Sequence, residues 1–122
     1  MVDIVMKFGG TSVADAARIR ASAALVAAEA ATGAAVAVVV SAMAGETDRL
    51  IALAEQLGGG LGEDESDVIL SSGEQVSSAL MALALKEKGL KAQSFQAWQS
   101  AIWVDGAPGS ARISGFDTAA VE

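Results

Sequence analysis

Two short apolar runs near the start of the chain enclose a segment with helical periodicity. Residues 4–8 and 35–40 are nearly continuous in apolar side chains, which is typical of strands, and the second run is apolar at every position. Between them, apolar residues recur at three- and four-residue spacing, at Ala16, Ile19, Ala23, Val26 and Ala30. This spacing predicts a helix with one buried stripe. A strand, a helix and a second strand in this length form a β-α-β unit, so we expect an α/β fold with a mainly parallel sheet. Because the second strand is apolar at every position, we expect it to be buried on both faces.

The two ends of this first helix carry local signals of their own. Ser12, followed three residues later by Asp15, forms a capping-box pattern that predicts the start of the helix. Gly33 is a suitable residue for its end. The solvated face of the helix is expected to carry Asp15, Arg18, Ser22 and Glu29.

The middle of the chain predicts two more helices. The first covers residues 47–57, with Leu50, Ala54 and Leu57 on one side, and three glycines follow it. The second covers residues 68–88 and is expected to be interrupted near Ser72 and Gly73. Its buried stripe is predicted at Val76, Leu80 and Leu83, and Gly89 is its expected end.

The last third of the chain predicts strands. Residues 91–95 are expected to form a third strand, and residues 102–104 and 111–113 a hairpin around a Gly- and Pro-containing turn. The tail from Asp117 to Glu122 has the composition of the start of another helix. Trp98 and Trp103 are expected to serve as core or interface anchors, because no strongly basic segment lies near them.

Composition narrows the chemistry that the chain can perform. Of its 122 residues 52% are hydrophobic, its net charge is −7, and it contains neither Cys nor His. Nucleic acids and anionic membranes bind proteins through clusters of Lys and Arg, so neither is an expected partner of a chain with this negative charge. Without Cys and His, disulfides, thiolate zinc sites and Ser-His-Asp or Cys-His catalysis are excluded. The first residues lack the pattern of a signal peptide, so we expect a cytoplasmic protein.

A lysine and two glycines stand where the first strand meets the first helix. The segment is the run Lys7-Phe8-Gly9-Gly10-Thr11-Ser12-Val13. Glycines let backbone N–H groups approach an anion, and a lysine adds a positive charge, so the segment is suited to hold a phosphate. It is neither a Walker A loop nor a dinucleotide fingerprint, which order their residues differently. From the residues alone, a tight strand-to-helix turn with a solvated lysine remains an equal alternative.

This run resembles the opening signature of aspartate kinases, in the amino-acid kinase family. Three further blocks of the chain resemble that family in order and spacing. They are residues 38–43 followed by Thr47, Asp48 and Leu50; Ser72-Gly73-Glu74 followed by Ser78; and Ser94-Phe95-Gln96-Ala97-Trp98-Gln99. The resemblance covers essentially the whole chain. It implies a three-layer α/β/α, carbamate kinase-like fold that residues 1–122 form only in part.

The resemblance implies a site for ATP at the ends of the first two strands. The residues that would meet ATP are Lys7, Phe8, Gly9, Gly10 and Ser41. Lys7 would be the catalytic residue, stabilising the transferring phosphoryl group, because phosphoryl transfer needs positioning and charge neutralisation above all. For Ser41 the alternative is a hydroxyl that satisfies a local backbone group at a strand end.

The same resemblance assigns the binding of aspartate to Thr47 and Glu74. A carboxylate such as that of Glu74 can pair with the ammonium group of the substrate, and the hydroxyl of Thr47 can donate to its carboxylate. Without the resemblance, Thr47 would be interpreted as a helix cap and Glu74 as an exposed acid in the first turn of a helix. The acidic stretch 63–67 is expected to be a solvated cluster, since it lacks a recognisable metal-binding loop.

The implied reaction transfers the γ-phosphoryl group of Mg-ATP to the side-chain carboxylate of L-aspartate, giving 4-phospho-L-aspartate. The resemblance places this step at the entry to lysine, threonine, methionine and diaminopimelate biosynthesis. The Mg²⁺ ion would be bound mainly by the phosphates of ATP, and the sequence offers no protein metal site. Residues 1–122 would be the N-terminal portion of the catalytic domain, without the half that completes ATP binding and without ACT regulatory domains.

Two alternatives remain open from the sequence. The chain could be a non-catalytic half-domain that pairs with a second copy of itself or with another chain, whereas a complementing chain that restores activity would favour a split enzyme. It could also belong to another member of the amino-acid kinase family, with glutamate or acetylglutamate as the substrate. If the aspartate kinase assignment holds, we expect the 122-residue chain by itself to have little or no kinase activity.

Overall fold

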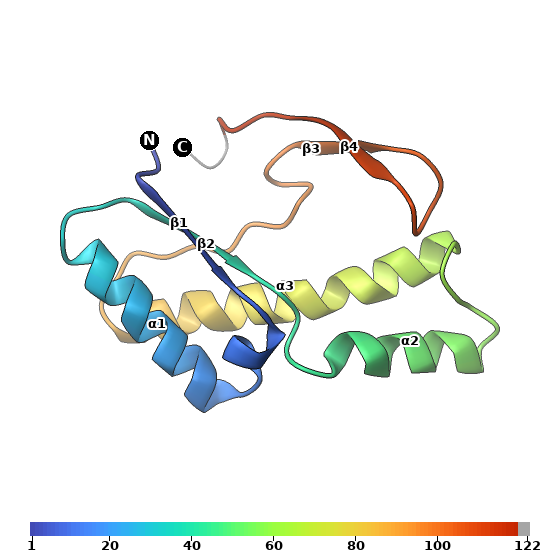
Figure 1. Cartoon of the computed structure of the whole chain (residues 1–122), viewed down its shortest axis with the longest axis horizontal. Coiled ribbons are helices and arrows are strands. Elements are labelled where there is room, and N and C mark those ends of the chain that lie inside the picture. The colour runs from blue at the N-terminus through green and yellow to red at the C-terminus, as the bar shows by residue number, and fades with distance from the viewer. Residues whose placement is uncertain (120–122) are drawn as a thin grey trace.

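The computed structural model describes residues 1–119 and has two sheets and three long helices (Figure 1). In chain order, the elements are β1 (Ile4–Phe8), the short 3₁₀ helix η1 (Gly10–Val13), α1 (Ala16–Ala30), β2 (Val36–Val40), α2 (Glu46–Gln56), α3 (Asp64–Glu87), β3 (Ile102–Asp105) and β4 (Arg112–Phe116). β1 and β2 pair in parallel, and β3 and β4 pair antiparallel. The predicted α/β class, the parallel sheet and the hairpin are confirmed.

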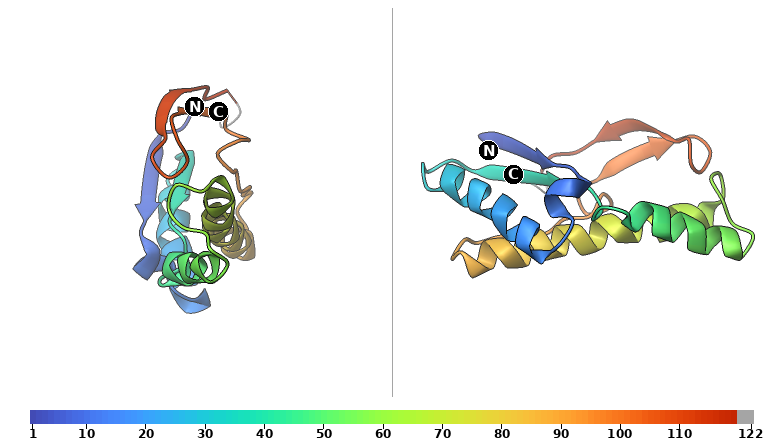
Figure 2. Two further views of the ribbon diagram at one scale, coloured as in Figure 1. Left: turned by 90° about the vertical axis from the view of Figure 1, so that its right-hand side faces the viewer. Right: turned by 60° about the horizontal axis from the view of Figure 1, so that its bottom comes forward.

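Two of the helices, α1 and α3, cover one face of the parallel pair. α1 and α3 pack against each other and against β2, below the two strands in the right-hand view of Figure 2. The core between them contains Phe8, Val13, Ile19, Ala23, Val26, Met81, Ala84 and Leu85. On the opposite face, Val5 and Val39 are exposed. Two of the three predicted layers are therefore present in residues 1–119, and the prediction that the second strand is buried on both faces is wrong for the chain as described.

The start of α1 differs from the predicted capping box. Ser12 lies inside η1, so the helix begins four residues later, with Asp15 as its N-cap. The Asp15 carboxylate accepts a hydrogen bond from the backbone N–H of Arg18 at 2.8 Å. Ser22, predicted on the solvated face, is buried, because its hydroxyl donates to the carbonyl oxygen of Ser12 at 2.8 Å and so ties α1 to η1. Gly33, with φ +94°, follows the end of the helix as predicted.

α2 agrees with the prediction to within one residue at each end. Leu50 and Ala54 are buried, but Leu57 is 91% exposed, because the helix ends at Gln56 and the chain turns away through Gly58 at φ +80°. The stripe predicted from periodicity is therefore right for two of its three residues.

α3 is longer than predicted and is not interrupted. It begins at Asp64 and runs through Ser72 and Gly73 to Glu87. The hydroxyls of Ser71 and Ser72 donate to carbonyl oxygens three residues earlier, so these polar side chains are satisfied within the helix. Gly89, with φ +84°, follows the C-terminus as predicted.

The buried stripe of α3 is also displaced from its predicted position. Val76 and Leu83 are exposed, whereas Leu80 is partly buried and packs against the core. The buried positions are Ser66, Gly73, Ser77, Met81, Ala82, Ala84 and Leu85. Small residues let α3 lie close to α1 and α2, so the face rich in Gly, Ser and Ala is the packed one. By length and composition alone this helix could cross a membrane, but its contacts with α1, α2 and β2 equally suit a core helix.

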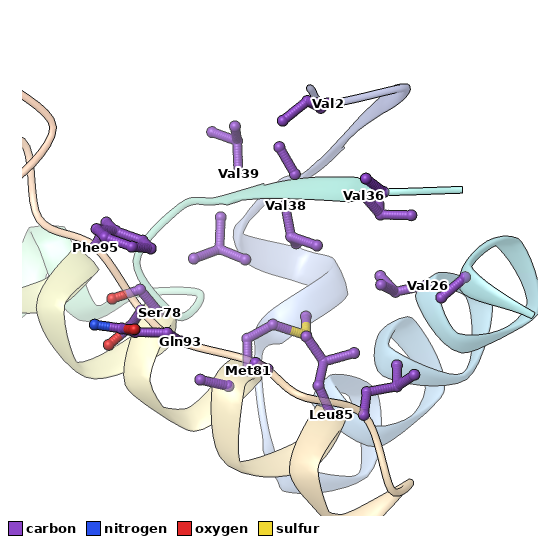
Figure 3. A pocket seen from close by; sticks show the side chains of 18 of the residues that line it. Val2, Val26, Val36, Val38, Val39, Ser78, Met81, Leu85, Gln93 and Phe95 are labelled. Carbon is purple, nitrogen blue, oxygen red and sulfur yellow. The ribbon is translucent and has the colours of Figure 1, made fainter. Parts of the chain in front are cut away.

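The predicted third strand at residues 91–95 does not form. This segment has no strand assignment and lies across a cavity of about 570 Å³ from β2 (Figure 3). Val38 of β2 and Met81 and Leu85 of α3 line the cavity. Because the gap keeps the segment from the free edge of β2, no ladder of backbone hydrogen bonds joins the two in the described part of the chain.

The hairpin extends beyond the main core. The backbone N–H of Gly109, in its turn, donates to Asp67 in the first turn of α3 at 3.0 Å. Trp98 and Trp103 are exposed, so within residues 1–119 neither is a core anchor. Arg112 is exposed. Of the helix start predicted at residues 117–122, residues 117–119 have no helix assignment and residues 120–122 lie outside the described residues.

Candidate functional site

The carboxyl ends of β1 and β2 lie side by side and bring the lysine-glycine segment next to Ser41. Lys7 pairs with Val39 and Phe8 with Val40 in the parallel register. The backbone N–H of Ser41 then donates to the carbonyl oxygen of Phe8 at 3.1 Å. In open parallel sheets, ligands bind outside the carboxyl ends of the strands. This end of the sheet is therefore the candidate site.

Lys7 and Phe8 point to opposite sides of β1. Phe8 is buried in the core below the strands, whereas the Lys7 side chain is exposed. Within residues 1–119, no hydrogen bond or ion pair joins the Lys7 ammonium group to another residue. A lysine with no structural partner at a strand end is free to bind an anion.

Gly9 and Gly10 have different surroundings. A Cβ atom added to Gly9 would meet nothing within 4 Å, so open space lies beside this residue. A Cβ atom added to Gly10 would lie 3.0 Å from the carbonyl oxygen of Ala42, so no larger residue fits there without a shift. Gly10 is thus required by the packing of the turn, and Gly9 leaves room for a ligand.

We expect this difference to appear in stability measurements. Gly10→Ala should lower the free energy of unfolding by about 1–3 kcal/mol, the usual cost of overpacking. Gly9→Ala should change it by less than about 0.5 kcal/mol, because the added methyl group meets only solvent. Urea denaturation of the two variants, followed by circular dichroism, measures both values. Equal destabilisation by the two substitutions would contradict the described packing.

Thr47 lies in the first turn of α2 but does not cap it. The N-cap is Gly45, with φ +79° and no side-chain hydrogen bond to the helix, so the interpretation of Thr47 as a cap is wrong. Its neighbour Glu46 forms an ion pair with Arg49 at 2.7 Å, and this hydrogen-bonded partner lowers the pKa of Glu46. Thr47 itself is exposed, and its hydroxyl is available to a ligand.

Glu74 lies in the middle of α3, ten residues after its first residue, so the interpretation as a first-turn acid is also wrong. Its carboxylate oxygen Oε1 accepts a hydrogen bond from the backbone N–H of Ala42 at 3.3 Å. Ala42 directly follows Ser41 at the end of β2. This contact spans 32 residues of sequence and brings Glu74 to the candidate site.

The structure therefore brings five predicted residues to one end of the sheet, Lys7, Gly9, Gly10, Ser41 and Glu74, with Phe8 buried beneath them. Thr47 stands on the first turn of the helix that follows this loop. Among residues 1–119, no group of three or more carboxylates is arranged to hold a metal ion. Ala42 and Gly73 were not predicted to take part, and only their place inside two of the resembling blocks could have drawn attention to them.

The chain is similar to known proteins over nearly its whole length. The model of the "Amino acid kinase family" matches residues 4–122. An aspartokinase of Geobacillus stearothermophilus is 49% identical over 94% of this chain, and aspartokinase 2 of Bacillus subtilis is 44% identical over the same share. The chain spans 28% of the length of each of these two relatives.

Solved structures agree with this similarity. The crystal structure of an aspartate kinase from Synechocystis matches 70% of this chain and 15% of its own, with a TM-score of 0.66 and 48% identity. E. coli aspartokinase III, in complex with aspartate and ADP, matches 81% of this chain and 32% of its own, with a TM-score of 0.66 and 26% identity. The chain therefore belongs to the amino acid kinase family, a family of phosphoryl-transferring enzymes, and has its fold in part.

Proposed function

We propose that this chain supplies the phosphate-binding turn and part of the amino-acid pocket of an aspartate kinase. The observation that carries the proposal is the contact of Glu74 with Ala42, which brings a carboxylate next to the turn of Lys7, Gly9 and Gly10. A carboxylate suits the ammonium group of an amino acid, and the lysine suits the phosphates of ATP. The identity of 42–49% to aspartokinases favours aspartate as the amino acid.

In this proposal, the side-chain carboxylate of L-aspartate attacks the γ-phosphorus of ATP. A bond forms between the carboxylate oxygen and phosphorus, the bond to the bridging oxygen breaks, and 4-phospho-L-aspartate and ADP leave. The Lys7 ammonium group neutralises charge on the transferring phosphoryl oxygens, and backbone N–H groups of Gly9 and Gly10 hold the phosphates. Mg²⁺, bound mainly by ATP phosphates, supplies further charge neutralisation.

Thr47 and Ser41 complete the part of the site that this chain contains. The Thr47 hydroxyl donates to a carboxylate of aspartate, and Glu74 accepts from its ammonium group. Ser41 lines the phosphate side, at the end of β2. The product belongs at the entry to lysine, threonine, methionine and diaminopimelate biosynthesis, and we place the reaction in the cytoplasm.

A chimaera tests the activity directly. In it, this chain replaces the matching segment of the Geobacillus stearothermophilus aspartokinase, with which it shares 49% identity. We expect aspartate-dependent release of ADP in a coupled assay, and no comparable rate with glutamate or N-acetylglutamate. A chimaera that folds but prefers either of these substrates would overturn the assignment of aspartate.

The 122-residue chain without the rest of an aspartokinase is expected to show little or no turnover. It covers 28% of the relatives' length, and one end of a sheet does not enclose both substrates. The measurement is the same coupled assay on the purified chain. Aspartate-dependent turnover by the chain alone would contradict this expectation.

A non-catalytic role as a binding half-domain has one observation in its favour. Large apolar side chains are exposed on and before the hairpin, at Trp98, Trp103, Ile113 and Phe116. Clustered exposed apolar residues mark a surface for another chain or another part of the same chain. Size exclusion with mass analysis distinguishes the two roles: a stable complex without nucleotide binding favours the half-domain, and activity restored by a complementing chain favours the kinase.

A further inference from the structure

Ala42 is the residue at which three segments of the candidate site meet. It follows β2 by two residues and is 5% exposed. Its backbone N–H donates to Glu74 on α3 at 3.3 Å. Its carbonyl oxygen faces Gly10, and its methyl group faces Gly73.

Gly73 provides the contact on the side of α3. A Cβ atom added to Gly73 would lie 3.0 Å from the Cβ of Ala42, 3.5 Å from Cδ1 of Leu50 and 3.6 Å from Cγ of Glu46. A separation of 3.0 Å is tighter than nine in ten real Cβ contacts, so an added methyl group would force α3 or the loop to shift by a few tenths of an ångström. The absent side chain at Gly73 therefore lets α3 lie directly on the loop after β2, one residue before Glu74.

Gly10 provides the contact on the side of the phosphate turn. The position of its missing Cβ lies 3.0 Å from the Ala42 carbonyl oxygen and 3.6 Å from the Cα of Ala44. The turn after β1 and the helix that carries Glu74 are thus spaced by one small residue. A change on either side of Ala42 alters how far the proposed phosphate-binding turn stands from the proposed aspartate-binding carboxylate.

We infer that Ala42, held between Gly10 and Gly73, is a positioning residue that sets the place of the Glu74 carboxylate relative to the phosphate turn. The inference deepens the proposed function and rests on it for its kinetic consequences. Ala42 acts through Glu74 and Gly10. Its N–H engages one carboxylate oxygen of Glu74 and leaves the other for a ligand.

A reciprocal exchange of the two small residues tests the contact. Gly73→Ala alone should push α3 away from the loop, although alanine has the higher helix propensity and would otherwise stabilise α3. Adding Ala42→Gly removes the opposing methyl group, so the double variant again has one methyl group between the segments. Gly60→Ala is the matched control, since a Cβ atom there would meet nothing within 4 Å.

Amide hydrogen exchange in the 122-residue chain measures the contact without any need for activity. Exchange at residue 42 should become about tenfold faster in Gly73→Ala, return to within about twofold of the original in the double variant, and stay unchanged in Gly60→Ala. Exchange at residue 42 that is unaffected by Gly73→Ala, or a double variant no better than the single one, would overturn the inference.

The chimaera then separates positioning from simple loss of folded protein. Gly73→Ala should raise the KM for aspartate about tenfold and the KM for ATP by a clearly smaller factor, because the contact loosens but keeps its acceptor, with recovery in the double variant. Equal changes in both KM values, without recovery, would overturn the inference. A chimaera without aspartate-dependent turnover would instead overturn the proposed function, and the exchange rates at residue 42 would still decide the contact.

Discussion

Replacing Lys7 by methionine in the chimaera is expected to lower kcat by a factor of about 10²–10³, the usual effect of removing one preorganised charge from a transition state. The substitution keeps the length of the side chain and removes its charge. Stability should hardly change, because the Lys7 side chain is exposed and has no partner within residues 1–119. The measurements are steady-state kinetics by coupled assay and urea unfolding of the same preparation.

Two controls make this result specific. Lys88→Met removes an exposed lysine at the far end of α3 and should leave kcat unchanged. Lys7→Arg keeps the charge but replaces a compact ammonium group by a planar one, so a partial loss is expected. If Lys7→Met retained more than about a third of the original kcat, Lys7 would be an ordinary solvated lysine at the end of a strand, which was the alternative from the sequence.

The paired strands and the C-terminal ends of the helices, which depend on local chemistry, were predicted well. β1, β2 and the hairpin follow from short apolar runs, and Gly33, Gly58 and Gly89 adopt positive φ where helices were predicted to end. These signals act within a few residues, so they do not depend on the rest of the fold.

Features that depend on distant segments were predicted poorly. Periodicity assigned Val76 and Leu83 to the buried face of α3, yet the packed face carries Gly73, Ser77 and Met81. Hydrophobicity alone favours large apolar residues, whereas close approach of helices favours small ones. Likewise, residues 91–95 have the composition of a strand, but pairing requires the edge of β2 within hydrogen-bonding distance.

The candidate site shows the same division. The sequence alone showed the order of Lys7, Ser41 and Glu74 and the resemblance of their blocks to aspartate kinases. The interpretations drawn from local rules, a cap for Thr47 and a first-turn acid for Glu74, were wrong, since α2 begins one residue earlier than predicted and α3 is not interrupted at Ser72 and Gly73. No local rule could have shown that Glu74 meets the backbone of Ala42, because 32 residues separate them.

The second large effect is expected from Glu74→Gln in the chimaera. Glutamine has nearly the same shape, and its Oε1 can still accept the hydrogen bond from the Ala42 N–H. What the variant loses is the negative charge that would face the ammonium group of aspartate. We expect the KM for aspartate to rise about 30-fold, which corresponds to about 2 kcal/mol, with a smaller change in kcat and in the KM for ATP.

Comparison with Glu74→Ala separates the two roles of this side chain. Alanine removes both the charge and the acceptor for Ala42, so the loop after β2 should loosen as well, and the KM for ATP should rise together with that for aspartate. Glu55→Gln, on the exposed side of α2, is the matched control for loss of a carboxylate and should change neither constant.

If Glu74→Gln left the KM for aspartate unchanged, Glu74 would serve only to hold the loop, and the amino-acid pocket would have to be sought elsewhere. If both constants rose equally in Glu74→Gln, the charge would be needed for the loop contact itself, because the retained acceptor would then have failed to keep Ala42 in place.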